Sequence, residues 1–200
     1  MKYFEKVTNY SVDIEKLKQT YAEVIEKLIE WSKDDPNLYD FNAICVNQIP
    51  HDPLSIRGGN IRGQYWTYPK ENWQEEERLK KIDEDSYTEL CEPFKKTYVE
   101  EVYKEIKKRW NIGRFRFLMK PARSCLSWHR DPEPRLHIPI ITNPGAHLVI
   151  DNRLKHLPAD GNVWFTDTRK YHTVFNGGEE NRIHLVGTFL GNRKTGKISI

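Results

Sequence analysis

Cysteine is scarce in this sequence: Cys45, Cys91 and Cys125 are the only three among 200 residues. An odd number of widely spaced cysteines, with no CxxC pair, argues against both a disulfide framework and a zinc-binding signature. We therefore expect reduced thiols in a cytoplasmic protein.

Long apolar runs and strong charge are also missing. No stretch approaches the roughly 18 apolar residues that a membrane span needs, and residues 1–6 (MKYFEK) carry no apolar core of a secretory signal. The net charge of +3 and the pI near 8.6 are mild, whereas nucleic-acid binding usually needs a stronger basic stripe. We expect neither a membrane nor a nucleic acid as partner, and the sequence leaves the oligomeric state open.

The composition that remains is that of a globular domain, with 38% hydrophobic and 30% charged residues. The length fits one domain with its own core. We predict a single domain over residues 1–200, made of a helical and loop part (1–112), a catalytic core (113–190) and a tail (191–200).

Two helices are predicted in the N-terminal part. Apolar residues recur every three or four positions over residues 14–31, the spacing of a helix with one apolar face. Ser11 or Asp13 is the expected N-cap. A second helix is predicted over residues 92–110, with Gly113 as its left-handed C-terminal cap.

The texture changes at residue 114, where short β-branched and aromatic segments alternate with Gly, Pro and Asn turns. Strands are predicted at 114–120, 124–129, 135–141, 147–150, 161–165, 173–175 and 182–190. Many short strands are typical of a sandwich, a jelly roll or a barrel. The fold class is therefore α+β, with the N-terminal helices packed on a C-terminal β-domain.

Residues 50–72 are rich in proline and glycine and predict a long loop with a short strand at 64–68. Arg57, Arg62, Tyr65 and Trp66 are candidates for substrate contact there, and the alternative is that the aromatic side chains pack the loop down. Whether the glycine-rich part (57–66) is a substrate lid stays open. The charged residues 71–85 are expected to lie in solvent.

The pattern that carries chemistry is His129-x-Asp131, followed by His172 and then Arg182. On a strand, residues two apart point to one face, so His129 and Asp131 can bind one ion, with His172 added from a neighbouring strand. Two histidines and a carboxylate form the facial triad of non-haem Fe(II) sites. The alternatives are a surface histidine beside a turn aspartate, and a core histidine at 172.

Arg182 begins an apolar strand, where a buried arginine needs an anionic partner. A ligand carboxylate would supply it, and a salt bridge to a protein acid is the alternative. Arg135 and His137 share one strand face and are further candidates for carboxylate binding, or else an exposed edge pair. Four aromatic residues are candidates for the pocket wall or for the core: Trp128, Trp164, Phe165 and Phe175.

Six segments together resemble the aspartyl/asparaginyl β-hydroxylase branch of the Fe(II)/2-oxoglutarate dioxygenases: residues 118–121, 128–131, 135–140, 163–167, 170–174 and 181–185. The resemblance covers roughly residues 114–190. It implies a double-stranded β-helix (jelly-roll) core, iron held by His129, Asp131 and His172, and 2-oxoglutarate bound by Arg182 with help from Arg135 and His137.

The activity that the resemblance implies is hydroxylation of an unactivated C–H bond of an amino acid or peptidyl residue, with O2 and 2-oxoglutarate as co-substrates. Asp131 is a departure, because the animal β-hydroxylase lacks this carboxylate, and it leaves the substrate open. Two alternatives are a non-oxidative cupin-type metal-binding protein and a nucleic-acid demethylase of the same superfamily.

Overall fold

The structure is a computed structural model that describes residues 2–58, 65–67, 75–77 and 81–192. The helices are α1 (Ile14–Trp31) and α2 (Tyr98–Arg109), with 3-10 turns η1 (Pro53–Gly58), η2 (Glu84–Ser86) and η3 (Glu92–Phe94). The strands are β1 (Phe4–Ser11), β2 (Ala43–Cys45), β3 (Asn47–Gln48), β4 (Tyr65–Thr67), β5 (Glu75–Glu77), β6 (Glu89–Leu90), β7 (Trp110–Lys120), β8 (Ser124–Cys125), β9 (His129–Arg130), β10 (Arg135–Ile141), β11 (Ala146–Ile150), β12 (Arg153–Lys155), β13 (Asn162–Thr166), β14 (His172–Asn176) and β15 (Arg182–Asn192).

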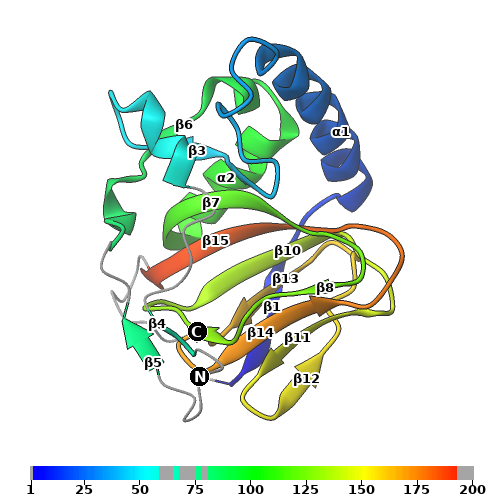
Figure 1. The fold of residues 1–200 in the computed structure, drawn as a ribbon. Coiled ribbons are helices and arrows are strands. Elements are labelled where there is room, and N and C mark those ends of the chain that lie inside the picture. Colours follow the sequence, from blue (N-terminus) through cyan, green and yellow to red (C-terminus); the bar gives the residue numbers. More distant parts are fainter. Residues whose placement is uncertain (1, 59–64, 68–74, 78–80, 193–200) are drawn as a thin grey trace.

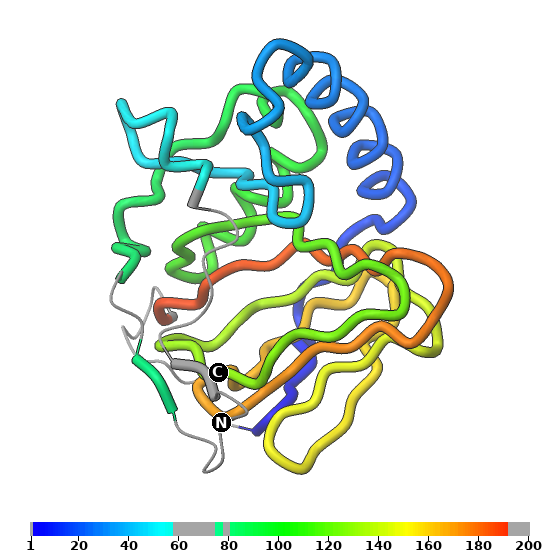
Figure 2. The backbone as a smooth tube through the Cα atoms, viewed as in Figure 1, coloured from blue at the N-terminus to red at the C-terminus, as the bar shows by residue number. Residues whose placement is uncertain are grey.

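The strands form two main antiparallel sheets. The first has six strands in the order β1-β13-β10-β15-β7-β2, and the second runs β12-β11-β14-β9-β4-β5, with β8 also paired to β14. Figure 1 shows both helices beside β7, on the opposite side of the first sheet from β11, β12 and β14. Figure 2 shows the chain passing through β1 before it enters α1, so that its first strand closes the far edge of the six-stranded sheet. The predicted α+β combination of N-terminal helices with a C-terminal β-region is confirmed, and the structure adds that the strands pair antiparallel.

The six-stranded sheet has two chemically different faces because side chains alternate along each strand. On β7, Phe115 and Phe117 are buried in the hydrophobic core, whereas Arg116 and Lys120, on the opposite face, line a cavity. The same alternation holds on β10 and β15. The sheet therefore presents an apolar face on one side and a polar, strongly basic face on the other.

The apolar face of the six-stranded sheet packs against both helices. One continuous core joins Leu17, Val24 and Leu28 of α1 with Val102 and Ile106 of α2 and with the sheet. The α1 helix begins after Asp13, whose side chain accepts a hydrogen bond from the backbone N–H of Lys16, as predicted for an N-cap. No helix among the described residues is both long and apolar enough to cross a membrane.

The second helix is shorter than predicted. Residues Glu92–Phe94 form a 3-10 turn, Lys96 adopts a positive φ of 60°, and the α-helix starts only at Tyr98. The backbone at Lys96 breaks a helix that would otherwise run through it. The prediction that Gly113 caps this helix is also wrong, because Gly113 lies inside β7.

Two further expectations need correction. Residues 124–129 form two short strands, β8 and β9, rather than one. Residues 71–85 are not all in solvent, since Glu84 is buried and its Oε1 lies 2.6 Å from Nη2 of Arg114. Because a buried charge must be paired, this acidic residue packs against β7 rather than lying in a solvated loop.

Candidate metal centre and its pocket

The three residues of the predicted triad come together where β9 and β14 run side by side. His129 opens β9, Asp131 follows directly after it, and His172 opens β14. The backbones of His129 and His172 are register partners in the antiparallel pair. Each of the three residues offers one ligand atom, and these atoms all lie within 4.8 Å of one another. The structure thus brings together residues that are 43 positions apart in the chain.

Both histidines are oriented by the backbone two residues before them. The Nδ1 atom of His129 lies 2.8 Å from the carbonyl oxygen of Ser127, and Nδ1 of His172 lies 3.0 Å from that of Lys170. A carbonyl only accepts, so each Nδ1 carries the proton and each Nε2 keeps its lone pair. Such partners fix the tautomer and the ring plane of metal-binding histidines.

The charges at this site suit a cation. Burial lowers the pKa of His172 to about 4, which keeps its ring neutral at neutral pH. Burial alone would raise the pKa of Asp131, but Arg135, with further help from His172 and His129, holds it well below its usual range. A neutral imidazole and an ionised carboxylate are the forms that bind metals. Two such nitrogens and one carboxylate are the donor set of non-haem Fe(II), so these residues fit that ion.

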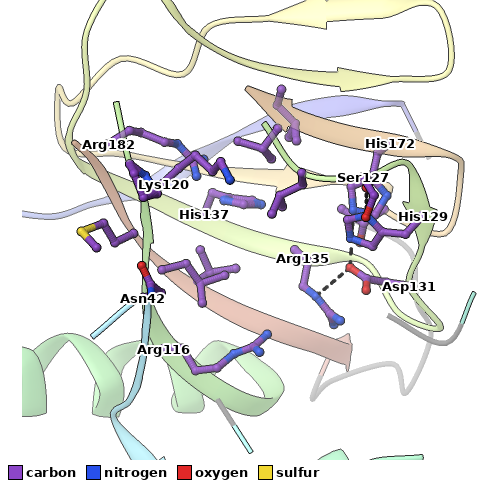
Figure 3. Close-up of a pocket in the computed structure, with 18 residues that line it drawn as sticks. Asn42, Arg116, Lys120, Ser127, His129, Asp131, Arg135, His137, His172 and Arg182 are labelled. Atoms are coloured by element: carbon purple, nitrogen blue, oxygen red, sulfur yellow. Dashed lines mark hydrogen bonds and ion pairs between the residues drawn. The ribbon is translucent and has the colours of Figure 1, made fainter. Parts of the chain in front are cut away.

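A cavity of about 330 Å³ lies between the two sheets and contains the triad. Four of its lining residues are cations, namely Arg116, Lys120, Arg135 and Arg182, and Figure 3 shows them spread along the cavity from Arg182 to the triad. Asp131 is the one acidic side chain in the described lining. The rest of the wall combines aliphatic side chains with histidines and the neutral polar residues Asn42, Ser127 and Thr168, so the pocket is basic and of mixed polarity.

Arg182 is the cation farthest along the cavity from the triad in Figure 3. Its side chain is buried, and burial lowers its pKa to about 9. Among the described residues no carboxylate lies within 4.0 Å of its guanidinium, which instead contacts Nδ1 of His184 at 2.6 Å. A buried cation without an acid is costly, so a bound carboxylate fits this end of the cavity.

Arg135 and His137 lie on the same strand, β10, but contact different parts of the cavity. The Nε atom of Arg135 lies 3.1 Å from Oδ2 of Asp131, beside the triad, and its Nη1 lies 3.5 Å from Glu133. His137 is buried in the cavity wall, with its Nδ1 3.4 Å from Nδ1 of His184. His137 is thus linked to the Arg182 end of the cavity, whereas Arg135 lies beside the triad and pairs with Asp131.

Several lining residues were not singled out from the sequence. Arg116 and Lys120 project into the cavity from β7, and Asn42 and Ser127 come from loops. The signal for the two cations is present in the alternation Arg-Phe-Arg-Phe-Leu-Met-Lys, since the polar face of a half-buried strand must meet water or a ligand. Nothing in the local sequence of Asn42 or Ser127 distinguishes them.

The four aromatic candidates for the pocket wall do not line it. Phe165 is fully buried in the hydrophobic core, on the apolar face of the six-stranded sheet, and Trp128 is 37% exposed. Neither they nor Trp164 and Phe175 belong to the described lining, whose apolar part is made of smaller side chains such as Leu118, Met119 and Val174. The alternative interpretation, that these aromatic residues serve packing, is correct for Phe165.

The predicted loop is only partly described. Arg57 pairs with Asp35 at 2.8 Å on the surface, so it is engaged away from the cavity. Arg62, most of the glycine-rich segment and the side chains of Tyr65 and Trp66 lie outside the described residues. The short strand predicted there exists as β4, whose Trp66 is the backbone partner of His129.

One known protein family matches most of this chain. Residues 57–190 match the family described as aspartyl/asparaginyl beta-hydroxylase, which is more than half of the chain and starts well before the segment at 114 that carries the resemblance. The fold and the site define a β-sheet protein with a candidate metal centre of two histidines and one carboxylate. The chain belongs to the aspartyl/asparaginyl beta-hydroxylase family, and the prediction of an enzyme of the hydroxylase class is confirmed.

Solved structures with lower similarity are also found. An oxidoreductase of the 2OG-Fe(II) oxygenase family from Burkholderia pseudomallei shares 22% identity over 39% of this chain and 43% of that one, with a TM-score of 0.35. A prolyl-4-hydroxylase from Pseudomonas putida shares 9% identity over 94% and 86%, with a TM-score of 0.43. AviO1 from Streptomyces viridochromogenes Tue57 shares 14% identity over 93% of this chain and 88% of that one, also with a TM-score of 0.43. This chain spans less than half of the Burkholderia protein, and no curated protein matches it.

Proposed function

We propose that the protein is an Fe(II)- and 2-oxoglutarate-dependent hydroxylase that acts on an unactivated C–H bond of an amino acid or a peptidyl residue. The observation that carries this proposal is one cavity that holds both the His129–Asp131–His172 cluster and Arg182, a buried cation with no described acid beside it. A metal-binding protein that needs no dicarboxylate has no use for the second feature. Membership of a hydroxylase family supports the same reaction class.

We further propose that the two sheets form a double-stranded β-helix, or jelly roll, around this cavity. Antiparallel pairing throughout the described strands and lining residues drawn from both sheets support it. In such a fold the ends of short strands surround a central pocket. His129 and His172, on neighbouring strands of one sheet, then face Arg116, Arg135 and Arg182 on the other.

Each group has a task in this proposal. His129, Asp131 and His172 would hold the iron, and Arg182, assisted by His137, would bind the distal carboxylate of 2-oxoglutarate. When bound, Fe(II) with 2-oxoglutarate and O2 supplies the oxidation, and succinate and CO2 are the co-products. Arg135 keeps Asp131 ionised and in place, and it lies near enough to the triad to assist the co-substrate. Leu118, Val174 and Val186 exclude water from the cavity.

The test is a titration under anaerobic conditions. Purified protein is loaded with Fe(II), 2-oxoglutarate is added, and the metal-to-ligand charge-transfer absorption is recorded. We expect this band for the native protein, no metal binding for His129→Ala, and metal binding with a much weaker response to 2-oxoglutarate for Arg182→Leu. Metal binding without any effect of 2-oxoglutarate on the spectrum would instead favour a non-oxidative metal-binding protein.

The substrate is found in the same system under air. Succinate release is measured with single amino acids and with short peptides, because a true substrate couples and accelerates co-substrate turnover. Asp131→Ala serves as the inactive control. The proposal fails if the native protein neither binds 2-oxoglutarate nor releases succinate in the presence of Fe(II).

A further inference from the structure

His184 is a buried histidine that the proposed mechanism does not use. It stands two residues after Arg182 on β15, so both side chains project from the same face of the strand. Both residues are buried: 2% of the surface of His184 and 6% of that of Arg182 is exposed. His184 is not itself a lining residue of the cavity, but it contacts Arg182, the lining cation that would receive the co-substrate's carboxylate.

The hydrogen bonds at this position fix the state of each ring. A guanidinium only donates, so the 2.6 Å contact between Nη2 of Arg182 and Nδ1 of His184 makes that nitrogen an acceptor. The proton of His184 is therefore on Nε2. The Nδ1 atom of His137, 3.4 Å from the same acceptor, must then be a donor. The Nδ1 atom of His184 thus accepts from both Arg182 and His137. Among the described residues it is the one hydrogen-bond partner of the Arg182 guanidinium.

We infer that His184 is a positioning residue, which holds the guanidinium of Arg182 in the plane that receives the distal carboxylate of 2-oxoglutarate without neutralising its charge. The inference rests on the proposed function. Arginine binds carboxylates through a rigid planar fork of donors. A hydrogen bond from one Nη2 fixes that plane and leaves other donors of the fork for the ligand.

The chemistry explains why a neutral acceptor stands here rather than an acid. A carboxylate at position 184 would pair with Arg182 and compete with the incoming ligand. An apolar residue would leave the guanidinium free to rotate, so that binding would have to order it. Burial and the adjacent Arg182 also lower the pKa of His184 well below its ordinary value, which keeps the ring uncharged.

The experiment compares three substitutions in the full-length protein loaded with Mn(II), and it measures the dissociation constant of 2-oxoglutarate by calorimetry. His184→Asn keeps an acceptor where Nδ1 lies, and binding should stay within about threefold of the native value. His184→Leu removes the acceptor and should weaken binding roughly ten- to hundredfold. His184→Asp, which has the shape of the asparagine variant but carries a charge, should weaken it most. The affinity for Mn(II) itself should be the same in all four proteins.

The ranking separates positioning from packing. A residue that merely fills space would tolerate leucine best and would treat asparagine and aspartate alike, and that result would overturn the inference. If the leucine variant does not fold, the asparagine and aspartate variants, which are nearly identical in shape, still decide. The native protein tests the proposed function separately: no 2-oxoglutarate binding by the native protein sinks both ideas, whereas native binding with unaffected variants sinks this one alone.

Discussion

The Nε atom of Arg135 lies 3.1 Å from Oδ2 of Asp131, and the two side chains are both buried. The carboxylate of the candidate metal centre therefore already has a counter-charge before any ion binds. Such a pair keeps Asp131 ionised in a position where burial alone would favour its neutral form. A metal ion bound at this site would share the carboxylate of Asp131 with Arg135.

The first prediction concerns this pair. Arg135→Leu leaves Asp131 as a buried charge with less compensation, and we expect the metal-free protein to lose about 3 kcal/mol or more of its free energy of unfolding. Saturating Mn(II) should recover much of that loss, because the ion supplies the missing positive charge and binds only the folded chain. Urea unfolding with and without Mn(II) measures both values.

A surface pair provides the control. Arg123 and Glu179 form an ion pair at 2.7 Å with both side chains largely exposed, so Arg123→Leu should cost less than about 1 kcal/mol, with or without the ion. An Arg135→Leu variant that is no less stable than this control, or one whose loss is the same in both conditions, would show that the pair does not serve the metal site.

The second prediction concerns pH. Burial holds the pKa of His172 at about 4, against an ordinary value of 6.5. Between these values the unfolded chain binds a proton that the folded chain does not. The contribution of neutral His172 to the free energy of unfolding is therefore fully present above pH 6.5 and is lost as the pH drops toward 4. His172 alone should account for about 3 kcal/mol of this loss in the metal-free protein. His137 and His184, whose pKa values burial also lowers, act in the same direction.

Urea unfolding at a series of pH values tests this slope. His172→Gln cannot take up the proton, so its stability should depend less steeply on pH over the same window. His51→Asn is the matched control, because His51 is exposed and asparagine tolerates its φ of 62°. Equal slopes for the native protein and His172→Gln would show that this histidine does not titrate with folding.

The third prediction concerns Gly113, which faces the buried Glu84. A Cβ atom at position 113 would lie 2.7 Å from both Cβ and Oε2 of Glu84 and 2.9 Å from its backbone oxygen. Gly113→Ala should therefore displace the Glu84–Arg114 pair and cost about 1–3 kcal/mol. Gly177→Ala is the control, since its Cβ would meet only one atom, at an ordinary 3.5 Å. The midpoint of urea unfolding compares them, and equal midpoints would contradict the prediction.

Local patterns predicted the elements that depend on local chemistry. The apolar stripe and the Asp13 cap defined α1 almost to the residue, because both signals lie within a few turns of chain. The triad was predictable because its residues follow one another in the expected order, His129, Asp131 and then His172. Only the long-range pairing of β9 with β14 brings His172 to the other two. Gly113 shows the opposite case, since a glycine after a helix normally indicates a cap, and only the distant Glu84 explains why it is a strand residue here.

The basic face of the cavity illustrates the same limit. Arg116 was visible as one of several charged residues in an alternating strand, but its burial depends on the opposite sheet closing over it. The pairing of Arg135 with Asp131 was equally hidden, because the two residues are four positions apart in the chain and a turn must fold them together. Long-range packing decides which polar face meets solvent and which becomes a pocket, and one strand's sequence does not contain that information.

The fourth prediction concerns the β4–β5 hairpin, which extends the second sheet next to the His129 strand. Glu75 of β5 accepts hydrogen bonds from the Tyr171 hydroxyl and from Nη2 of Arg130, the latter at 2.5 Å. These contacts hold the hairpin to β9 and to the residue just before β14, next to the two histidines of the candidate metal centre. Because the Arg130 and Glu75 side chains are about one-third exposed, the effect of removing the charge is local rather than global.

Glu75→Gln should therefore increase hydrogen exchange at the amides of Tyr65–Thr67 by roughly three- to tenfold, while the free energy of global unfolding changes by less than about 1 kcal/mol. Hydrogen-exchange mass spectrometry resolves this segment. Glu76→Gln, an exposed neighbour on the same strand, changes the same charge without touching the contact and should leave exchange unaltered. If both variants exchange alike, the hairpin is held by its backbone pairing with β9, and the side chain of Glu75 does not anchor it.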